Sequence, residues 1–276
     1  MAETVPTLAL NDGHRIPQIG YGCWQLSDAQ APELVGKALQ AGYRLIDTAA
    51  AYGNEAGVGR AVRDAQVSRD EIVLTTKLWN DRQGRDEARR AFDESLKRLG
   101  LPYVDLYLIH WPCPQRHLFV ETWKTLIELQ KEGHAKSIGV SNFTSEHIAT
   151  LVAETGVTPA VNQIELHPHF QRKAPRTDDA RHGIVTESWS PLGQGKELND
   201  PAILAIAKAH GKTAAQVVLR WQVQTGCVAI PKTARPERII ENIALFDFEL
   251  STQEMDRIAA LDRSDGRIGP DPATFC

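Results

Sequence analysis

Short apolar segments recur along the chain, and each ends in a polar or aromatic side chain. Seven segments follow this pattern, at residues 45–47, 73–77, 106–110, 138–142, 160–163, 186–189 and 228–232. Short, nearly continuous apolar runs are typical of strands that are buried on both faces of a parallel sheet. Residues 18–22 form an eighth candidate. The pattern therefore predicts eight strands whose ends carry the polar groups.

Amphipathic helices are predicted between these strands. Between residues 88 and 99, apolar side chains recur at spacings of three and four, and Gly100 stands where the helix should end. Similar stripes begin at Leu34, at Phe119 before Gly133 and at Ile148 before Gly156, and capping-box spacings join Thr213 to Gln216 and Ser251 to Glu254. Strands that alternate with helices indicate an α/β fold.

A doubly wound sheet and a closed barrel both fit this alternation. The barrel is favoured because the strand count reaches eight and no linker or change of composition marks a second domain. We expect residues 1–276 to form a single (β/α)8 TIM barrel domain. Residues 7–10 and 14–16 flank Asn11-Asp12-Gly13, which predicts a β-hairpin that caps the bottom of the barrel.

Two segments depart from the regular pattern. Residues 173–181 offer almost no apolar stripe, so we expect a short or poorly packed helix there, with Pro175 at its first position. The tail, residues 262–276, is rich in Gly, Pro and Asp, and we expect it to fold back over the site as a loop.

The composition places the chain among ordinary globular proteins. Of 276 residues, 42% are hydrophobic and 24% charged, and the formal net charge of −4 gives no general attraction to nucleic acid or to an anionic membrane. No apolar run approaches the length of a membrane span, and no secretory signal is expected at the N-terminus. We expect a cytoplasmic monomer. The scattered Cys23, Cys113, Cys227 and Cys276 are predicted to be reduced thiols, without a metal site.

Four residues at the strand ends suggest acid/base chemistry. In a parallel barrel, Asp47, Lys77 and His110 reach one rim, and Tyr52 follows on a loop. A tyrosine hydroxyl is a weak acid at neutral pH, and a neighbouring ammonium favours its ionised form. An aspartate keeps a buried lysine charged, and a histidine can orient a carbonyl oxygen.

Other interpretations of these four residues exist. Asp47 and Lys77 could form a structural ion pair, Tyr52 could be a half-buried surface aromatic, and His110 could be a hydrogen-bonded core histidine. Lys77 could also form a Schiff base, as in barrel aldolases. Convergence of all four residues on one rim favours the acid/base interpretation.

The chain lacks a G-x-G-x-x-G fingerprint, so a Rossmann domain is not expected. The loop at residues 190–195 could wrap a pyrophosphate with its backbone N–H groups. Lys232, Thr233, Arg235 and Arg238 surround a predicted helix start that suits a phosphate, although such a basic cluster is also typical of a solvated surface. Trp189 could stack on a flat ring.

Ordered motifs over essentially the whole chain resemble the aldo-keto reductases, and within them the bacterial 2,5-diketo-gluconate reductases. The matching segments are residues 42–49 with 52–55, 76–80, 105–112, 137–143, 162–168, 189–195 and 230–232. Two departures are evident. Thr233-Ala234 replaces the usual Ser-Val, which keeps a hydroxyl but removes an apolar contact, and residues 173–181 lack the usual apolar positions.

The resemblance implies that NADPH binds in extended form and that Tyr52 is the proton donor, with Lys77, Asp47 and His110 as its partners. It places the nicotinamide carboxamide at Ser141, Asn142 and Gln163, with Trp189 stacked on the ring. The remaining cofactor contacts are Ser190, Leu192, Gln194 and Gly195 in the loop, Lys232, Thr233, Arg235 and Arg238 at the 2′-phosphate, and Glu241 and Asn242 near the adenine. Substrate would lie against His110, Trp24, Trp79 and Trp111.

Together these features predict an oxidoreductase that reduces a carbonyl group with NADPH. The expected substrates are ketones, dicarbonyls or aldehydes of the 2,5-diketo-gluconate or methylglyoxal type. An alternative is a nicotinamide-binding barrel with a regulatory or redox-sensing role and negligible turnover. The intact set of Asp47, Tyr52, Lys77 and His110 argues against that alternative, because a sensor does not need a tuned tyrosine.

Overall fold

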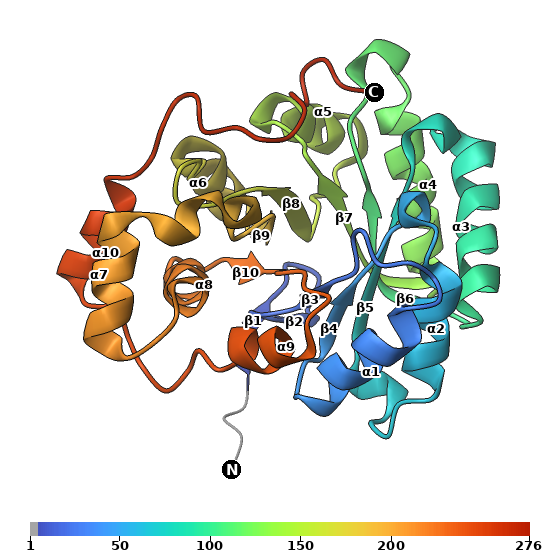
Figure 1. Cartoon of the computed structure of the whole chain (residues 1–276). Coiled ribbons are helices and arrows are strands. Elements are labelled where there is room, and N and C mark those ends of the chain that lie inside the picture. Colours follow the sequence, from blue (N-terminus) through green and yellow to red (C-terminus); the bar gives the residue numbers. More distant parts are fainter. Residues whose placement is uncertain (1–4) are drawn as a thin grey trace.

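Eight parallel strands form a closed barrel in the computed structural model, which describes residues 5–276 (Figure 1). The strands are β3 (Tyr21–Gly22), β4 (Leu45–Asp47), β5 (Val73–Leu78), β6 (Val104–Ile109), β7 (Ala135–Ser141), β8 (Val161–Glu165), β9 (Val185–Trp189) and β10 (Val228–Ala229). Each pairs with the next in chain order, and a parallel bridge between Ile19 and Ala229 joins the first to the last. The predicted (β/α)8 barrel is confirmed.

Helices cover the outside of the barrel (Figure 1). They are α1 (Ala31–Gln40), α2 (Glu55–Arg63), α3 (Arg85–Leu99), α4 (Phe119–Lys131), α5 (Ser145–Thr155), α6 (Lys173–Arg181), α7 (Pro201–His210), α8 (Ala214–Gln224), α9 (Pro236–Ile243) and α10 (Thr252–Ala259). The predicted helix ends are present. Gly100 closes α3 in the left-handed conformation, with φ of 66°, and Thr213 and Ser251 open α8 and α10 through capping boxes.

The barrel interior has two layers, because alternate residues of each strand face inward. The lower layer is apolar and includes Leu45, Leu106, Leu108, Val161 and Val228. Two positions further along three of these strands lie the polar residues Asp47, His110 and Gln163. The polar layer therefore lies directly above the apolar layer.

The N-terminal hairpin covers the apolar layer from below. Strands β1 (Thr7–Ala9) and β2 (Arg15–Pro17) pair antiparallel, and Leu10 and Ile16 pack into the apolar interior layer. The side-chain amide of Asn11 donates to the carbonyl of Pro159 at 2.9 Å. The predicted cap over the bottom of the barrel is thus present.

Helix α6 is as sparsely packed as the sequence predicts. Its one buried side chain is Asp179, whose carboxylate accepts hydrogen bonds from Asn162 Nδ2 at 3.2 Å and Thr186 Oγ1 at 3.0 Å. Pro175 occupies the third helical position, so its placement at the first position was wrong by two residues. The third N–H also lacks a partner within a helix, which explains why proline is accepted there.

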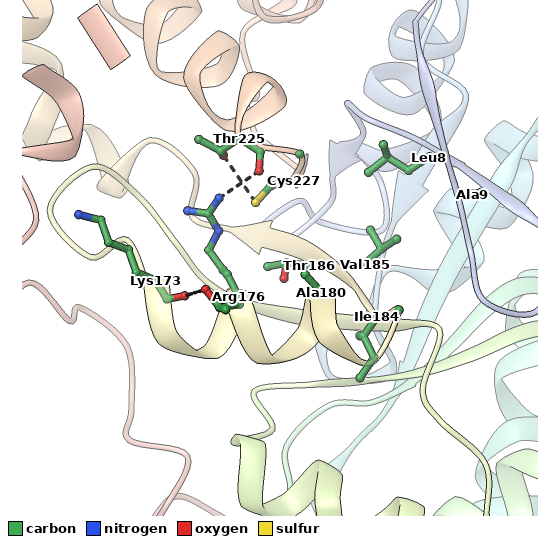
Figure 2. A pocket seen from close by; sticks show the side chains of 13 residues that line it. Leu8, Ala9, Lys173, Arg176, Ala180, Ile184, Val185, Thr186, Thr225 and Cys227 are labelled. Carbon is green, nitrogen blue, oxygen red and sulfur yellow. Dashed lines mark hydrogen bonds between the residues drawn. The ribbon is translucent and has the colours of Figure 1, made fainter. Parts of the chain in front are cut away.

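A cavity of about 740 Å³ lies beside α6, bordered by the hairpin and the turn before β10 (Figure 2). Ala180, Ile184 and Val185 line it together with Leu8 and Thr225. Its lining includes the hairpin and Val185, the first residue of β9, so it lies at the opposite end of the barrel from Asp47, Lys77 and His110. Helix α6 contributes the short Thr177 and Ala180 to the lining, beside the longer Lys173 and Arg176.

Within residues 5–276, no helix combines the length and apolar character needed to cross a membrane.

Filling this cavity should stabilise the protein. We expect Ala180→Leu to raise the free energy of unfolding by roughly 0.5–2 kcal/mol, because it buries apolar surface without displacing a packed group. Urea denaturation measures the change. Ala174→Leu is the matched control, since Ala174 and Ala180 are both exposed on α6 but only Ala180 lines the cavity. Equal effects of the two substitutions would contradict the cavity-filling explanation.

Candidate active site

The upper rim of the barrel brings the four predicted acid/base residues together. Asp47 ends β4, Lys77 lies near the end of β5, and His110 directly follows β6. Tyr52 ends the short 3-10 turn η1 (Ala50–Tyr52), and Gly53 closes that turn with φ of 66°. The turn directs Tyr52 back toward the strand ends, within hydrogen-bond distance of Lys77.

Asp47 and Lys77 form an ion pair inside the barrel. Lys77 Nζ lies 2.6 Å from Asp47 Oδ1, 2.9 Å from the carbonyl oxygen of Thr48 and 3.5 Å from the Tyr52 hydroxyl. Lys77 is completely buried. Burial alone lowers the pKa of the ammonium, but Asp47 and Tyr52 raise it above its ordinary value, so Lys77 stays charged.

Tyr52 is a protonated group in this site. Burial raises the pKa of its hydroxyl to about 12, and this effect exceeds the lowering by the Lys77 ammonium. Lys77 therefore lowers the pKa of Tyr52, as predicted, but burial raises it by more. A hydroxyl with this pKa carries its proton throughout the neutral pH range.

His110 is a neutral imidazole. Burial, assisted by the positive charge of Lys77, holds its pKa well below the ordinary value. Its ring packs edge-on against Tyr52 at 5.7 Å between centroids and against Trp79 at 5.0 Å. Nδ1 is buried and has no hydrogen-bond partner among the described residues. The ring is thus held by packing.

A second hydrogen-bond network joins the ends of β6, β7, β8 and β9. Asn142 Nδ2 donates to the His110 carbonyl oxygen at 3.0 Å, and Asn142 Oδ1 accepts from Trp189 Nε1 at 2.8 Å. Ser141 Oγ donates to the Gln163 carbonyl oxygen at 2.9 Å. These contacts bring the predicted Ser141, Asn142, Gln163 and Trp189 to one side of the rim. Asn142 adopts φ of 63°, a conformation that asparagine tolerates better than most residues.

Glu187 belongs to this site, although its position in a strand did not single it out. Gln163 Nε2 donates to Asp47 Oδ2 at 2.8 Å and to Glu187 Oε2 at 3.1 Å. Glu187 is completely buried, and burial together with the charge of Asp47 raises its pKa to about 8. Strand alternation was the available signal, because Glu187 stands two positions before Trp189 and shares its face.

The predicted phosphate-binding loop forms hydrogen bonds within itself. After Ser190 the chain enters the 3-10 segment η5 (Gly193–Asn199), where the N–H groups of Gly193 and Gly195 donate to Ser190 and Leu192. Gln194 adopts φ of 55° within this segment. Two of the N–H groups expected to face a pyrophosphate therefore have internal partners.

The predicted basic cluster lies after β10. Thr233 Oγ1 accepts from the N–H of Arg235 at 3.1 Å, just before α9 begins at Pro236. Arg235 and Arg238 are exposed, and neither they nor Lys232 forms an ion pair with a described residue. Glu241 accepts a hydrogen bond from Thr213 Oγ1 at 2.8 Å, and Asn242 is buried. The cluster combines free positive charge with a helix start.

The C-terminal tail runs back across the rim (Figure 1). The N–H groups of Ile268 and Gly269 donate to the carboxylate of Glu165 at 2.6 and 2.9 Å. Further on, the ring of Phe275 lies 4.6 Å from that of Trp111, beside the loop that follows His110. Trp111 is buried by this contact, whereas Trp24 is 45% exposed on the loop after β3. The expectation that the tail covers the site agrees with this course.

A disulfide joins Cys113 to Cys276, with 4.6 Å between the Cα atoms. The prediction of four reduced thiols was therefore wrong for this pair, while Cys23 and Cys227 are free and buried. Sequence spacing could not reveal the pair, because 163 residues separate its members and only the returning tail brings them together. The bond fixes the tail to the loop after β6.

Comparison with known proteins agrees with this geometry. The model of the Aldo/keto reductase family matches residues 18–263. An aldo-keto reductase of Mycolicibacterium smegmatis (strain ATCC 700084 / mc(2)155) is 54% identical over 270 residues, covering 98% of each chain. Methylglyoxal reductase DkgA of Escherichia coli (strain K12) is 51% identical over 270 residues, covering 97% of each. A crystal structure of a Gox0644 mutant in complex with NADPH has a TM-score of 0.96 at 50% identity, covering 99% of this chain and 100% of the other. The chain belongs to the aldo/keto reductase family, which confirms the resemblance.

The disulfide makes a testable contribution to stability. We expect Cys276→Ser to lower the free energy of unfolding by about 2–4 kcal/mol, because the unfolded chain loses a long closed loop. Dithiothreitol should cause the same loss in the wild-type protein and none in Cys276→Ser. Cys227→Ala is the control, since it removes a free thiol and should leave the response to dithiothreitol intact. A wild-type protein that is indifferent to the reductant would contradict the pairing.

Proposed function

We propose that this protein reduces carbonyl compounds with NADPH and that Tyr52 donates the proton. The observation that carries the proposal is the contact of the Tyr52 hydroxyl with Lys77 Nζ at 3.5 Å, beside the neutral ring of His110. A proton donor, a cation that stabilises the anion it leaves, and a neutral hydrogen-bond donor are the groups that carbonyl reduction requires.

Each of these residues has a separate task. The neutral imidazole of His110 donates a hydrogen bond to the carbonyl oxygen and orients it without giving up a full proton. Tyr52 transfers its proton to that oxygen as negative charge develops there. Lys77 then stabilises the tyrosinate, and Asp47 keeps Lys77 charged in a buried setting. A lysine held in this pair is a poor nucleophile, which argues against Schiff-base chemistry.

The residues on the rim fit NADPH, which supplies a hydride when it is bound. The indole of Trp189 is only half-buried and its nitrogen is fixed by Asn142, so one face can stack on the nicotinamide. Ser141, Asn142 and Gln163 would hold the carboxamide, and Lys232, Thr233, Arg235 and Arg238 the 2′-phosphate. Glu241 and Asn242 would lie near the adenine. The NADPH complex of a Gox0644 mutant, at 50% identity, supports NADPH as the cofactor.

The substrate proposed for this site is a small polar dicarbonyl, ketone or aldehyde. Trp79 packs against His110, and Trp111 packs against Phe275 of the tail, so aromatic side chains narrow the approach to Tyr52. Escherichia coli DkgA, 51% identical, is a methylglyoxal reductase. Methylglyoxal and 2,5-diketo-gluconate are therefore the first compounds to test.

The proton-donor role is tested by Tyr52→Phe. We expect at least a roughly 100-fold loss of kcat with methylglyoxal, because general acid catalysis typically contributes 10²–10⁴-fold. NADPH binding, followed by fluorescence quenching, should stay nearly unchanged. Retained turnover would overturn the assignment. A wild-type protein that binds NADPH but reduces none of a panel of carbonyl compounds would instead indicate a regulatory barrel.

The phosphate-binding role is tested by Arg238→Ala. Loss of a charged hydrogen bond to the 2′-phosphate should raise KM for NADPH roughly 10-fold or more and leave KM for NADH nearly unchanged. Steady-state kinetics with both cofactors measure the split. Arg257→Ala, on the exposed face of α10, is the matched control. Equal losses with NADPH and NADH would count against the role.

A further inference from the structure

Glu187 is a buried carboxyl group that the proposed reaction leaves without a task. It lies inside the barrel on β9 and contacts the rest of the site through Gln163. Its Oε2 accepts from the Gln163 amide, and its Oε1 has no partner among the described residues. A completely buried carboxyl group in this position requires a physical explanation, because burial of an unpaired charge is costly.

The Gln163 amide connects Glu187 to the ion pair. Gln163 has two N–H bonds on Nε2, and the two acceptors within reach are Asp47 Oδ2 at 2.8 Å and Glu187 Oε2 at 3.1 Å. An amide oxygen in the same place would face a carboxylate, so the orientation of the amide is determined by its neighbours. Both N–H bonds are thus used within the protein, and the amide oxygen remains available to a ligand.

We propose that Glu187, as a neutral carboxyl group, is a positioning residue for carbonyl reduction: with Asp47 it fixes the Gln163 amide so that the amide oxygen can accept from the nicotinamide carboxamide. This inference rests on the proposed function. Asp47 alone would hold the amide at one point and leave it free to rotate. The second anchor removes that freedom before the cofactor arrives.

The charges around Glu187 explain why it is neutral. Asp47 on β4 and Lys77 on β5 are the charged groups that face it, and they already neutralise each other. A second carboxylate would add an unbalanced negative charge beside Lys77. It would also oppose the formation of tyrosinate at Tyr52, because like charge disfavours ionisation. Burial, with the charge of Asp47, favours the protonated form of Glu187 up to a pH of about 8.

The first test compares Glu187→Ala with Glu187→Gln. We expect Glu187→Ala to lower kcat at least roughly 10-fold while the Kd for NADPH changes less than roughly 3-fold, since the phosphate contacts hold most of the cofactor. Glu187→Gln supplies a neutral acceptor of the same shape and should restore most of kcat. Ser188→Ala, which removes an outward hydrogen bond from the same strand, controls for loosening of β9.

The second test needs no cofactor and no turnover. In the unfolded chain Glu187 loses its proton near pH 4.5, whereas in the folded protein it keeps the proton to about pH 8. The folded state therefore binds one more proton between these values, and its stability falls as pH rises through that window. Relative to Glu187→Gln, the melting temperature of the wild-type protein should decline from pH 5 to pH 8 and stay level above pH 8.5.

The outcomes separate the inference from the proposed function. Unchanged kcat in Glu187→Ala, in an active wild-type background, would overturn the positioning role and leave the reductase proposal intact. A Glu187→Gln variant as impaired as Glu187→Ala would overturn the role of a neutral acceptor at this position. A melting-temperature difference that is flat from pH 5 to pH 8 would overturn the neutral state of the carboxyl group. Inactive wild-type protein would refute the proposed function, while the pH-dependent stability difference would still report on Glu187.

Discussion

The buried ion pair of Asp47 and Lys77 is the constraint on which the site depends. Removing two charges from water costs several kcal/mol for each, and only a close, fully hydrogen-bonded partner offsets that cost. The 2.6 Å contact, the Thr48 carbonyl oxygen and the Gln163 amide supply these bonds. Strands β4, β5 and β8 must therefore keep their positions for the pair to exist. The active site and the closed barrel stabilise each other.

Exclusion of water around the Asp47–Lys77 ion pair determines the protonation states of His110 and Tyr52. Leu45, Leu106 and Leu108 belong to the apolar interior layer, which the hairpin covers from below. This layer keeps water away from one side of the polar layer. In that setting the same burial holds His110 neutral and raises the pKa of Tyr52 to about 12. Two groups of opposite charge type are thus both kept uncharged by one physical cause. Lys77 is the exception, because it stays charged, and in the proposed reaction its charge would favour proton release from Tyr52.

The sequence predicted those features that depend on local pattern. The apolar runs that end in Asp47, Lys77 and His110 predicted which residues lie at the rim. The alternation of strands and helices, together with the count of eight strands, predicted the barrel. Tyr52 was predicted from its place on the loop after the strand that ends at Asp47, and the family resemblance implied its role. The pairing of Cys113 with Cys276 was missed, because no local pattern records how a tail returns to a loop far back in the chain. Glu187 was missed because its importance arises from a neighbour on another strand.

The two ends of the proposed cofactor site differ in net charge. Lys232, Arg235 and Arg238 are exposed or half-exposed and lack described counter-ions, so their net positive charge suits the proposed phosphate. At the reacting end, Lys77 is matched by Asp47, and no surplus charge remains. An ionised Glu187 would make that end negative. In the proposed reaction, this charge would disfavour both hydride transfer to the carbonyl group and formation of the tyrosinate. The proposed reaction therefore requires neutrality at the reacting end, and burial of Glu187 would supply it while keeping an acceptor for Gln163.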